Sequence, residues 1–379
     1  MPLAVRPPIA PMLARLTREL PAGDYTYEPK WDGFRCLAFV DGDDVDLRSR
    51  HDRPLARYFP ELVDGFRALR GGVGGFAFDG EIILATPGTF DFATLMTRLH
   101  PAATRVARLR SESPAAYVAF DLLAENTSDL RNRPFVERRG QLEAVLGSGT
   151  SPLFATPATR SLPVATDWFD RYQGAGVDGI VAKPDQGTYE PGRRAMLKVK
   201  HERTADCVVA GLRLIEGTSM VSSLLLGLYD DAGTLRHVGV VTQFAAADRR
   251  RLLDDLSPLA TRLDEHPWRD GFLIGASPIG RLPGSASRWT PDMEPDWLPL
   301  RPDRVCEVAF DQVDVDRFRH PARFRRWRPD REPRSCHIDQ IRVDAADFAE
   351  LFGAEWRRAV DVGAAAATAA GAPRAGSRR

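Results

Sequence analysis

Glu28-Pro29-Lys30-Trp31-Asp32-Gly33-Phe34-Arg35 is the most informative stretch of this chain. It contains Lys-x-Asp-Gly, in which a lysine stands where a strand is expected to give way to a turn at Gly33. Alone, the tetrapeptide is weak evidence, because an exposed lysine opening an ordinary turn looks the same. Its meaning depends on the residues that follow it.

Strand and helix signals alternate on both sides of this stretch. In 60–69, for example, Leu62, Phe66 and Leu69 recur at helical spacing. The strands expected before residue 201 are 25–29, 35–40, 45–48, 76–79, 81–85, 117–123, 179–183 and 196–200. The expected helices are 60–69, 92–99, 136–146 and 168–173, with one helical turn at 12–19. This mixture predicts an α+β domain over residues 1–202.

The pattern of expected strands and helices changes beyond residue 203. Short strands separated by Gly-rich turns are expected at 206–213, 222–229, 235–241 and 305–310, with one helix at 245–256. Such a series favours a small β-barrel of the OB-fold type over residues 203–362. Residues 363–379 consist of Ala, Gly, Ser, Pro, Thr and Arg without a packing pattern, and we expect a disordered tail there.

Composition excludes some classes of protein and leaves others open. The 379 residues are enough for two or three domains, and 43% hydrophobic and 27% charged residues are typical of globular proteins. Lys+Arg and Asp+Glu both number 52, so net charge does not indicate nucleic-acid binding, although arginines crowd residues 317–334.

The cysteines Cys36, Cys207, Cys306 and Cys336 lie far apart in the sequence and form no C-x-x-C pair. This disfavours a zinc site or a disulfide framework and suits a reducing cytoplasm. The N-terminus lacks a secretory signal pattern, and no apolar run reaches membrane-spanning length. We therefore expect a soluble cytoplasmic protein without a membrane partner.

Further short motifs follow Lys30 in a fixed order. They are Ser49-Arg50, Phe78-Asp79-Gly80-Glu81, Tyr117-Val118-Ala119-Phe120-Asp121, Asp178-Gly179-Ile180-Val181-Ala182-Lys183, Leu197-Lys198-Val199-Lys200 and Trp327-Arg328-Pro329-Asp330-Arg331. With Lys30-Trp31-Asp32-Gly33, this series resembles the motifs of the covalent nucleotidyltransferases, and specifically those of ATP-dependent DNA ligases. The resemblance implies an N-terminal adenylation domain with an ATP-grasp-like nucleotidyltransferase fold, built of antiparallel sheets and helices. An OB-fold domain should follow it.

By position, the resemblance implies that Lys30 attacks the α-phosphate of ATP and becomes adenylylated. A free lysine has a pKa of ~10.4, so a neutral amine at cytoplasmic pH needs a shift of roughly 3 units, or about 4 kcal/mol. We expect partial burial and neighbouring cations to lower the pKa of Lys30. Lys198 and Lys200, which alternation puts on one face of a strand, are those cations, and the resemblance implies that they bind the α-phosphate.

The same resemblance assigns the nucleotide contacts. Glu28 would accept a hydrogen bond from the adenine amino group, and Phe120 would stack on the adenine. Arg35 and Arg50 would hold the ribose and phosphates, since a guanidinium presents a fork of donors. Each residue also has a plainer interpretation: a strand-edge carboxylate, a core aromatic, or an arginine in a surface ion pair.

Acidic residues suggest a metal site. The resemblance implies that Glu81 and Asp178 bind the ribose hydroxyl and a divalent cation, Mg²⁺ or Mn²⁺. Acidic residues beside glycine are also common in turns. Arg328, Asp330 and Arg331 would contact the pyrophosphate and DNA. Two positions depart from the usual motifs: Asp178 replaces the usual glutamate, and Arg331 replaces the usual lysine.

The implied activity is sealing of nicked double-stranded DNA through lysyl-AMP and an adenylylated 5′-phosphate. The short lead-in before Lys30 leaves no room for a helical DNA-binding domain, so we expect a monomeric two-domain enzyme with a hinge between Lys200 and Ala205. Glu28–Arg35 and the arginine-rich residues 326–331 look most like those of bacterial ligase C. That resemblance implies a role in DNA repair beside a Ku-like end binder or a repair primase-polymerase.

Four rival functions share part of this pattern. An mRNA-capping guanylyltransferase shares the lysine motif but uses GTP, and an RNA ligase shares the motif and ATP. An NAD-dependent ligase would need clustered zinc cysteines, which this sequence lacks. A non-catalytic nucleic-acid-binding protein could retain the same fold.

Overall fold

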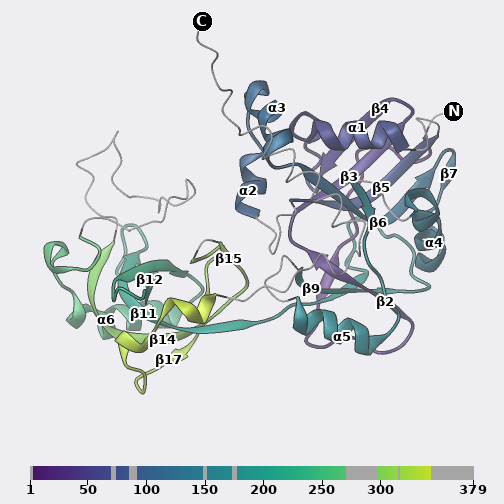
Figure 1. Cartoon of the computed structure of the whole chain (residues 1–379). Helices are drawn as coiled ribbons and strands as arrows, with labels where there is room; N and C mark the ends of the chain where they lie inside the picture. Colours follow the sequence, from purple (N-terminus) through teal and green to yellow (C-terminus); the bar gives the residue numbers. More distant parts are fainter. Residues whose placement is uncertain are drawn as a thin grey trace, which may run out of the picture. The chain divides into compact units, whose positions relative to one another are not determined.

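A computed structural model describes residues 3–69, 74–84, 92–147, 152–172, 177–269, 297–314 and 316–342. The chain divides into two compact units at residue 200, and the second unit runs from His201 to Val343. Figure 1 shows the first unit in purple to teal and the second in teal to yellow. The predicted disordered tail at 363–379 lies outside the described residues. No described helix is both long and apolar enough to cross a membrane.

Two β-sheets form the first unit. The smaller sheet has the order β1-β10-β9-β2, and in the larger sheet, of order β4-β3-β5-β6-β7, strand β8 also pairs with β6. The strands are β1 (Ala14–Leu16), β2 (Tyr25–Trp31), β3 (Phe34–Asp41), β4 (Asp44–Ser49), β5 (Gly75–Leu84), β6 (Ala115–Glu125), β7 (Ser128–Asp129), β8 (Leu153–Ala155), β9 (Val177–Pro184) and β10 (Met196–Val199). The strands are antiparallel except for the β1–β10 and β6–β8 pairs. The predicted α+β class is therefore confirmed.

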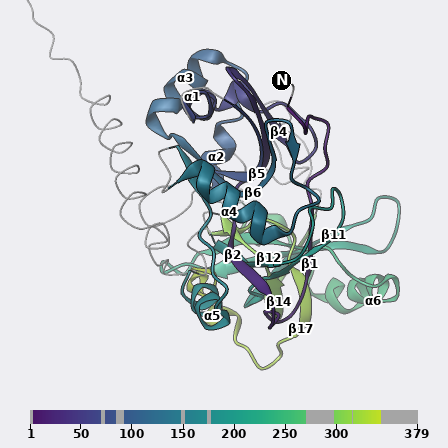
Figure 2. The same ribbon diagram turned by 90° about the vertical axis from the view of Figure 1, so that its right-hand side faces the viewer.

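Helices cover these sheets with apolar residues. They are η1 (Ala56–Tyr58), α1 (Pro60–Ala68), α2 (Phe92–Thr97), α3 (Ala103–Glu112), α4 (Phe135–Leu146) and α5 (Leu162–Arg171). Phe66 of α1 packs its ring against those of Phe78 and Tyr117, which lie on β5 and β6. Helix α4 lies beside β6, as Figure 2 shows, and buries Leu142 in the same core.

Two motif glycines allow close contacts between strands. A Cβ at Gly33, in the turn between β2 and β3, would collide with the carbonyl oxygen of Ile82 on β5. Gly179 on β9 has a φ of +134°, and a Cβ there would collide with the carbonyl oxygen of Val199 on β10. Both positions need glycine because other backbone occupies the space of a side chain. The two glycines fix the strands that carry Lys30 and Lys198.

The lead-in before residue 20 differs from the prediction. The expected helical turn at 12–19 is wrong, because β1 forms there and pairs in parallel with β10. The amide N–H of Leu13 donates to the carbonyl of Arg193, and that of Thr17 donates to Lys198. An open edge of β10 offers backbone partners that a single helical turn lacks. The lead-in is thus part of the smaller sheet.

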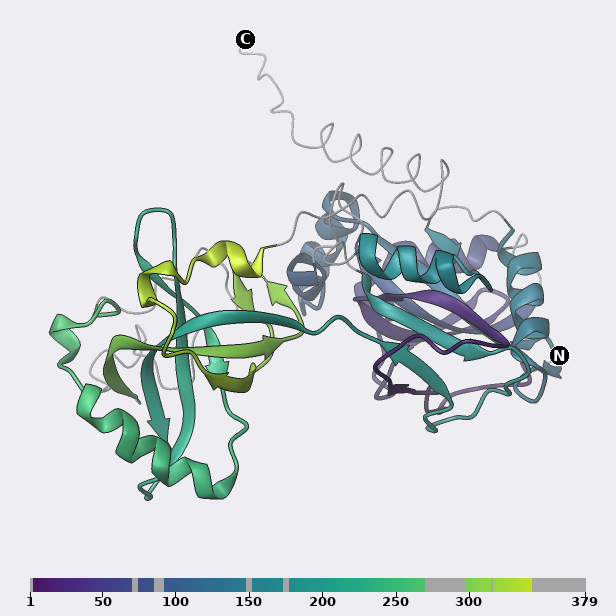
Figure 3. The same cartoon turned by 90° about the horizontal axis from the view of Figure 1, so that it is seen from below.

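The second unit is an OB-fold with a five-stranded antiparallel sheet of order β13-β12-β11-β14-β17. Its elements are β11 (Arg203–Leu214), β12 (Val221–Tyr229), β13 (Leu235–Val241), α6 (Ala246–Leu256), η3 (Ser257–Leu259), η4 (Leu263–Glu265), β14 (Leu298–Phe310), β15 (Val313–Asp314), β16 (Arg317–Phe318), β17 (Arg323–Trp327), η5 (Pro333–Ser335) and η6 (Ile338–Ile341). A bridge between Val241 and Ala322 connects β13 to the segment before β17. Helix α6, green in Figure 3, lies along this unit and buries Leu252 and Leu256.

Three cysteines that are distant in sequence share the core of the second unit. Cys207 and Cys306 are direct partners on β11 and β14, and Cys336 is buried in the same cluster. All three thiols are free, as is Cys36 in the first unit. Burial raises their pKa values, so these thiols serve as small apolar core residues.

Candidate active site

A pocket of about 260 Å³ in the first unit has walls from both sheets. The predicted site residues that line it are Glu28, Lys30, Arg35, Arg50, Glu81, Phe120 and Lys198. The other lining residues are Pro11, Leu13, Ala14, Pro29, Trp31, Val181, Lys183, Arg194 and Met196. Among the predicted site residues of the first unit, Asp178 and Lys200 are outside this lining. Pro11, Leu13 and Ala14 belong to the lead-in before residue 20, so this segment supplies part of the wall, a role that was not predicted from the sequence.

Lys30 lies on β2 and forms an ion pair with Asp178 on β9. Its Nζ is 2.7 Å from Oδ2 of Asp178, and Nζ of Lys200 is 2.6 Å from the same oxygen. Burial lowers the pKa of Lys30, but the charge and hydrogen bond of Asp178, together with the charges of Glu81 and Asp32, more than offset this, and the pKa is raised. The expectation of a lowered pKa is therefore wrong for the protein without nucleotide, because the nearest charge is a carboxylate.

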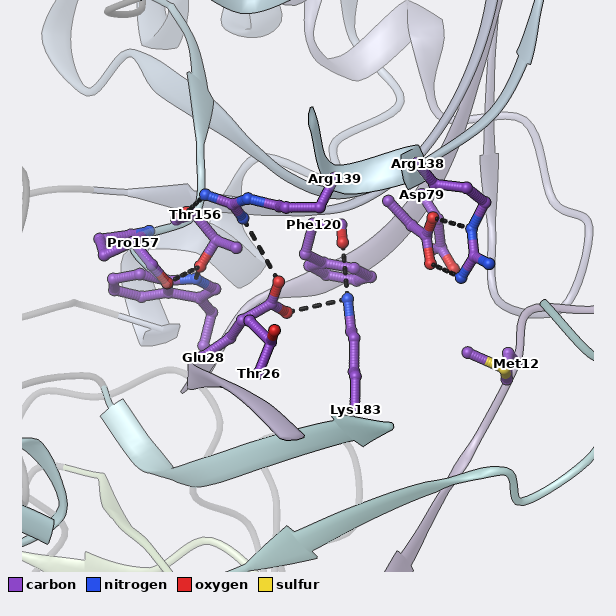
Figure 4. Close-up of polar contacts among 12 residues, drawn as sticks. Met12, Thr26, Glu28, Asp79, Phe120, Arg138, Arg139, Thr156, Pro157 and Lys183 are labelled. Atoms are coloured by element: carbon purple, nitrogen blue, oxygen red, sulfur yellow. Dashed lines mark hydrogen bonds and ion pairs between the residues drawn. The ribbon is translucent and has the colours of Figure 1, made fainter. Parts of the chain in front are cut away.

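Glu28 lines the pocket and is held by two cations. Its side chain is nearly fully buried, with Oε2 2.8 Å from Nζ of Lys183 and Oε1 3.3 Å from Nη1 of Arg139. Figure 4 shows Glu28 between these two side chains. Burial raises the pKa of Glu28, while Lys183 and Arg139 act against that rise. Lys183 belongs to a motif but had no assigned role, and no motif signal marks Arg139.

Arg35 and Phe120 form another wall of the pocket. Asp79 accepts two hydrogen bonds from the guanidinium of Arg35, at 2.6 Å from Nε and 2.5 Å from Nη2. The guanidinium carbon of Arg35 lies 4.6 Å from the ring centroid of Phe120, and Nζ of Lys183 lies 4.8 Å from it. Tyr189 also donates its hydroxyl to Asp79 at 2.6 Å. These contacts fix Arg35 and Phe120 in position before any ligand arrives.

Three lining cations have no carboxylate partner among the described residues: Arg50, Arg194 and Lys198. Burial and the charges of Lys30 and Lys200 lower the pKa of Lys198. Unpaired cations in a concave site favour an anionic ligand, and guanidinium groups suit phosphates. Of the two neighbouring arginines Arg193 and Arg194, Arg194 is the one that lines the pocket.

Lysine occurs at four positions in the whole sequence, Lys30, Lys183, Lys198 and Lys200. Three of them line the pocket, and the fourth pairs with Asp178 beside Lys30. Every other basic residue among the 52 Lys and Arg is arginine. An ammonium group can become a neutral nucleophile far more readily than a guanidinium, so lysine is concentrated where such chemistry would be needed.

Glu81 on β5 is the lining carboxylate most suited to a metal. Burial raises its pKa to about 7, against the lowering effects of Arg35 and Lys30. No group of three potential metal-ligating side chains occurs within the described residues. Mg²⁺ is usually held by one or two carboxylates together with substrate phosphates, so one carboxylate in a phosphate-sized cationic pocket fits it. Asp178, the second predicted ligand, is engaged by Lys30 and Lys200.

The predicted arginines of the last motif lie in the second unit. Nη1 of Arg328 donates to both carboxylate oxygens of Asp206, at 2.9 and 3.0 Å, and Nε and Nη2 of Arg328 bind Asp330. Nε of Arg331 is 3.6 Å from Asp206. Asp206, on β11, thus joins both motif arginines. Sequence reasoning missed it, since nothing in its local pattern distinguishes it.

Comparisons with known proteins agree with this arrangement. Residues 10–200 match the family described as "ATP dependent DNA ligase domain", and residues 217–331 match "ATP dependent DNA ligase C terminal region". DNA ligase C2 of Mycolicibacterium smegmatis is 49% identical over 343 residues, which cover 90% of this chain and 96% of that protein. DNA ligase C of Mycobacterium tuberculosis is 49% identical over 346 residues, with the same coverage.

Solved structures show the same fold at lower identity. A Lig E DNA ligase structure has a TM-score of 0.51 at 17% identity, covering 84% of this chain and 100% of that one. The family matches decide among the functions that the sequence left open. The chain therefore belongs to the ATP-dependent DNA ligases, enzymes that use ATP to seal nicks in DNA, and within them to the bacterial ligase C type.

Proposed function

We propose that Lys30 is the catalytic nucleophile and carries AMP between ATP and DNA. A bond forms between Nζ and the α-phosphorus as pyrophosphate leaves. A 5′-phosphate oxygen at the nick then attacks the same phosphorus and releases the lysine. Finally, the 3′-hydroxyl attacks the 5′-phosphorus and expels AMP. The observation that carries this proposal is that Lys30 shares one pocket with Glu28, Phe120 and three unpaired cations.

The remaining lining residues would bind the nucleotide. Glu28 would accept a hydrogen bond from the adenine amino group, while Phe120 stacks on the ring. Arg35 and Arg50 would hold the ribose and phosphates. Arg194 lines the same pocket without a carboxylate partner in the part of the chain that the structure describes, and it would join them at the phosphates. Lys198 and Lys200 would bind the α-phosphate.

Lys30 must lose its proton before it attacks. Its ion pair with Asp178 opposes that loss, so the productive arrangement requires Asp178 to release Lys30. Glu81, with the ATP phosphates, would hold Mg²⁺ or Mn²⁺, and Asp178 would supply a second carboxylate once released. When bound, the metal would neutralise charge on the phosphates and on the leaving pyrophosphate.

The second unit would contribute Arg328, Asp330 and Arg331 at the pyrophosphate and the DNA. Arg328 is paired with Asp206 and Asp330, so bidentate binding of an oxyanion would require its guanidinium to leave one of these carboxylates. The 203–362 segment would then act as a unit distinct from residues 1–202, with the hinge between Lys200 and Ala205.

The enzyme would act as a monomer in DNA repair in the bacterial cytosol and nucleoid. Support comes from a relative named "Multifunctional non-homologous end joining protein LigD" from Pseudomonas aeruginosa, 30% identical over 86% of this chain and 36% of that protein. A Ku-like end binder or a repair primase-polymerase would be its protein partner.

Changing Lys30 tests the proposal directly. With ATP labelled in its α-phosphate, the wild type should form a covalent adduct, and both Lys30→Ala and Lys30→Arg should form none. Lys30→Arg is the matched control, because it retains a cation beside Asp178 and so preserves the ion pair. Since only four lysines exist, peptide mass spectrometry can place the label unambiguously. An adduct that survives in either variant, or that maps elsewhere, would refute the assignment.

Sealing assays test the substrate. Nicked duplex DNA with ATP and Mg²⁺ should be joined, in contrast to nicked RNA, and NAD should not replace ATP. Both Lys30 variants should still join nicked DNA that already carries AMP on its 5′-phosphate, because such DNA bypasses both transfers that involve the lysine and leaves only the attack of the 3′-hydroxyl. If the variants fail to join this DNA, the substitutions disturb the site beyond removing the nucleophile.

A further inference from the structure

Helix α4 carries two consecutive arginines, Arg138 and Arg139, and Arg139 reaches Glu28 of the pocket (Figure 4). Arg138 is almost fully buried and forms a bidentate pair with Asp121, at 2.8 and 3.0 Å. It also donates to the backbone carbonyls of Arg133 and Gly187. All of these partners are structural, so Arg138 anchors the helix to β6 next to Phe120.

Arg139 has different partners. Nη1 lies 3.3 Å from Oε1 of Glu28, Nη2 donates to the carbonyl oxygen of Thr156 at 2.6 Å, and Nε donates to Glu143 at 2.6 Å. Arg139 is not part of the pocket lining. It can therefore act on a bound nucleotide only through the groups that it holds, of which Glu28 is the one that lines the pocket.

These contacts hold the strand of the nucleophile on two sides. Glu28 precedes Lys30 by two residues on β2, and Trp31 follows it. The indole N–H of Trp31 donates to Oγ1 of Thr156 at 2.9 Å, and Arg139 binds the carbonyl of the same threonine. Arg139 thus links α4, the segment after β8 and both flanks of Lys30.

The chemistry of Glu28 depends on its ionisation. An ionised carboxylate only accepts hydrogen bonds, whereas a protonated one also donates. Adenine presents an amino donor at position 6, where guanine presents a carbonyl acceptor. An ionised Glu28 therefore favours adenine and repels guanine. Protonation of Glu28, or its rotation, would remove that preference.

We propose that Arg139 is a positioning residue for base selection, which fixes Glu28 as an ionised acceptor aimed at the adenine amino group. The proposal rests on the proposed function, in which this pocket binds ATP. Lys183 binds the other oxygen of Glu28, so each oxygen has its own cation and the carboxylate cannot rotate freely. Lys183 lines the pocket and would touch the nucleotide, whereas Arg139 acts from outside it.

The charges around Glu28 predict a pH signature for loss of Arg139. Burial raises the pKa of Glu28, Lys183 from β9 and Arg139 from α4 lower it, and Asp121 from β6 raises it. Arg138 pairs with Asp121 and remains in place when Arg139 is replaced. Removing Arg139 therefore raises the pKa of Glu28 further, and the protonated fraction grows as the pH falls towards that value.

The test compares Arg139→Gln and Arg139→Lys with the wild type. Glu143→Gln is the matched control, because it removes the exposed partner of Arg139 and leaves Glu28 untouched. Initial rates of lysine labelling would be measured with ATP and with GTP between pH 6 and pH 9, so that kcat and KM are obtained separately.

In Arg139→Gln, KM for ATP should rise about ten- to a hundredfold, the loss expected for a hydrogen bond to a charged group. The preference for ATP over GTP should fall by a similar factor, and KM for ATP should climb as the pH is lowered. Arg139→Lys, which keeps a positive charge, should lie between the wild type and Arg139→Gln, and Glu143→Gln should match the wild type.

An Arg139→Gln enzyme with wild-type base preference and pH profile would overturn the proposal, whether or not its melting temperature falls. Equilibrium binding of ATP and GTP to the same variants separates this inference from the proposed function, because binding needs no transfer to Lys30. If the wild type binds ATP but is not labelled by it, the nucleophile assignment fails. The binding preferences of the Arg139 variants then still confirm or refute the role of Arg139.

Discussion

Replacing Glu81 by glutamine is expected to stabilise the first unit in the absence of ATP, and to do so increasingly as the pH rises. Burial raises the pKa of Glu81 from 4.5 to about 7. Arg35 from β3 and Lys30 from β2 lower this pKa, whereas Asp32 and Asp79 raise it. The carboxyl group of Glu81 therefore loses its proton less readily in the folded state than in the unfolded state.

The sign and size of this change in the free energy of unfolding follow from the linkage between proton binding and folding. Because the pKa is higher in the folded state, stability is unaffected below pH 4.5, decreases as the pH rises towards 7, and reaches its full loss above 7. A shift of about 2.5 units corresponds to about 3.4 kcal/mol as an upper limit. Glu81 is partly exposed, and solvent screening reduces the expected value to roughly 2 kcal/mol. Glutamine does not titrate, so the two proteins should differ most above pH 7.

Urea unfolding between pH 4.5 and pH 8.5 would measure this difference. The two units can unfold separately, so the transition that shifts on addition of ATP with Mg²⁺ is assigned to the first unit. Glu112→Gln on α3 is the control, since its half-exposed side chain pairs only at the surface with Arg108. It should change stability by less than about 0.5 kcal/mol at every pH.

Parallel pH profiles for Glu81→Gln and the wild type would refute the reasoning, as would a variant that becomes relatively less stable at high pH. Saturating ATP with Mg²⁺ should stabilise the wild type more than the variant, because a cation beside Glu81 removes the cost of its charge.

Two further changes test the turn and the ion pair beside Lys30. Asp178→Asn should lower the pKa of Lys30, because burial then acts without the carboxylate that opposes it. The pH at which acylation of Lys30 by an amine-reactive reagent is half-maximal should therefore decrease. An unchanged midpoint would contradict this prediction. Gly33→Ala should destabilise the first unit by about 1–3 kcal/mol in denaturant unfolding and slow adduct formation, because its Cβ meets the Ile82 carbonyl. Gly140→Ala on α4 should instead stabilise the first unit by about 0.5–1 kcal/mol, because a Cβ at Gly140 would meet no atom of the described residues within 4 Å. If both variants were less stable than the wild type, the steric explanation for Gly33 would be refuted.

Local sequence was sufficient for those features that a linear motif carries. The lining residues Glu28, Lys30 and Lys198 lie inside short motifs, and strand alternation together with the two sheets brings them to one pocket. The OB-fold was likewise visible as short strands with turns between them. In both cases, the information needed lies within a few residues of the feature.

Features that depend on packing between distant segments were not predictable. The contact of Arg139 with Glu28 needs α4 to pack beside β6, and β1 needs a partner strand that comes some 180 residues later. The pKa of Lys30 depends on a 2.7 Å contact with Asp178, whose position the chain order does not reveal. Cys207, Cys306 and Cys336 meet in one core for the same reason.

The restriction of lysine to four positions around the pocket has a practical consequence. Succinimidyl dyes, aldehyde supports and other amine-coupling reagents can react only at the chain terminus or at the nucleotide site. Reaction at these lysines should therefore inactivate the enzyme, and saturating ATP should protect it. The arginine-rich exterior leaves thiol tags or enzymatic ligation tags as the routes for immobilisation.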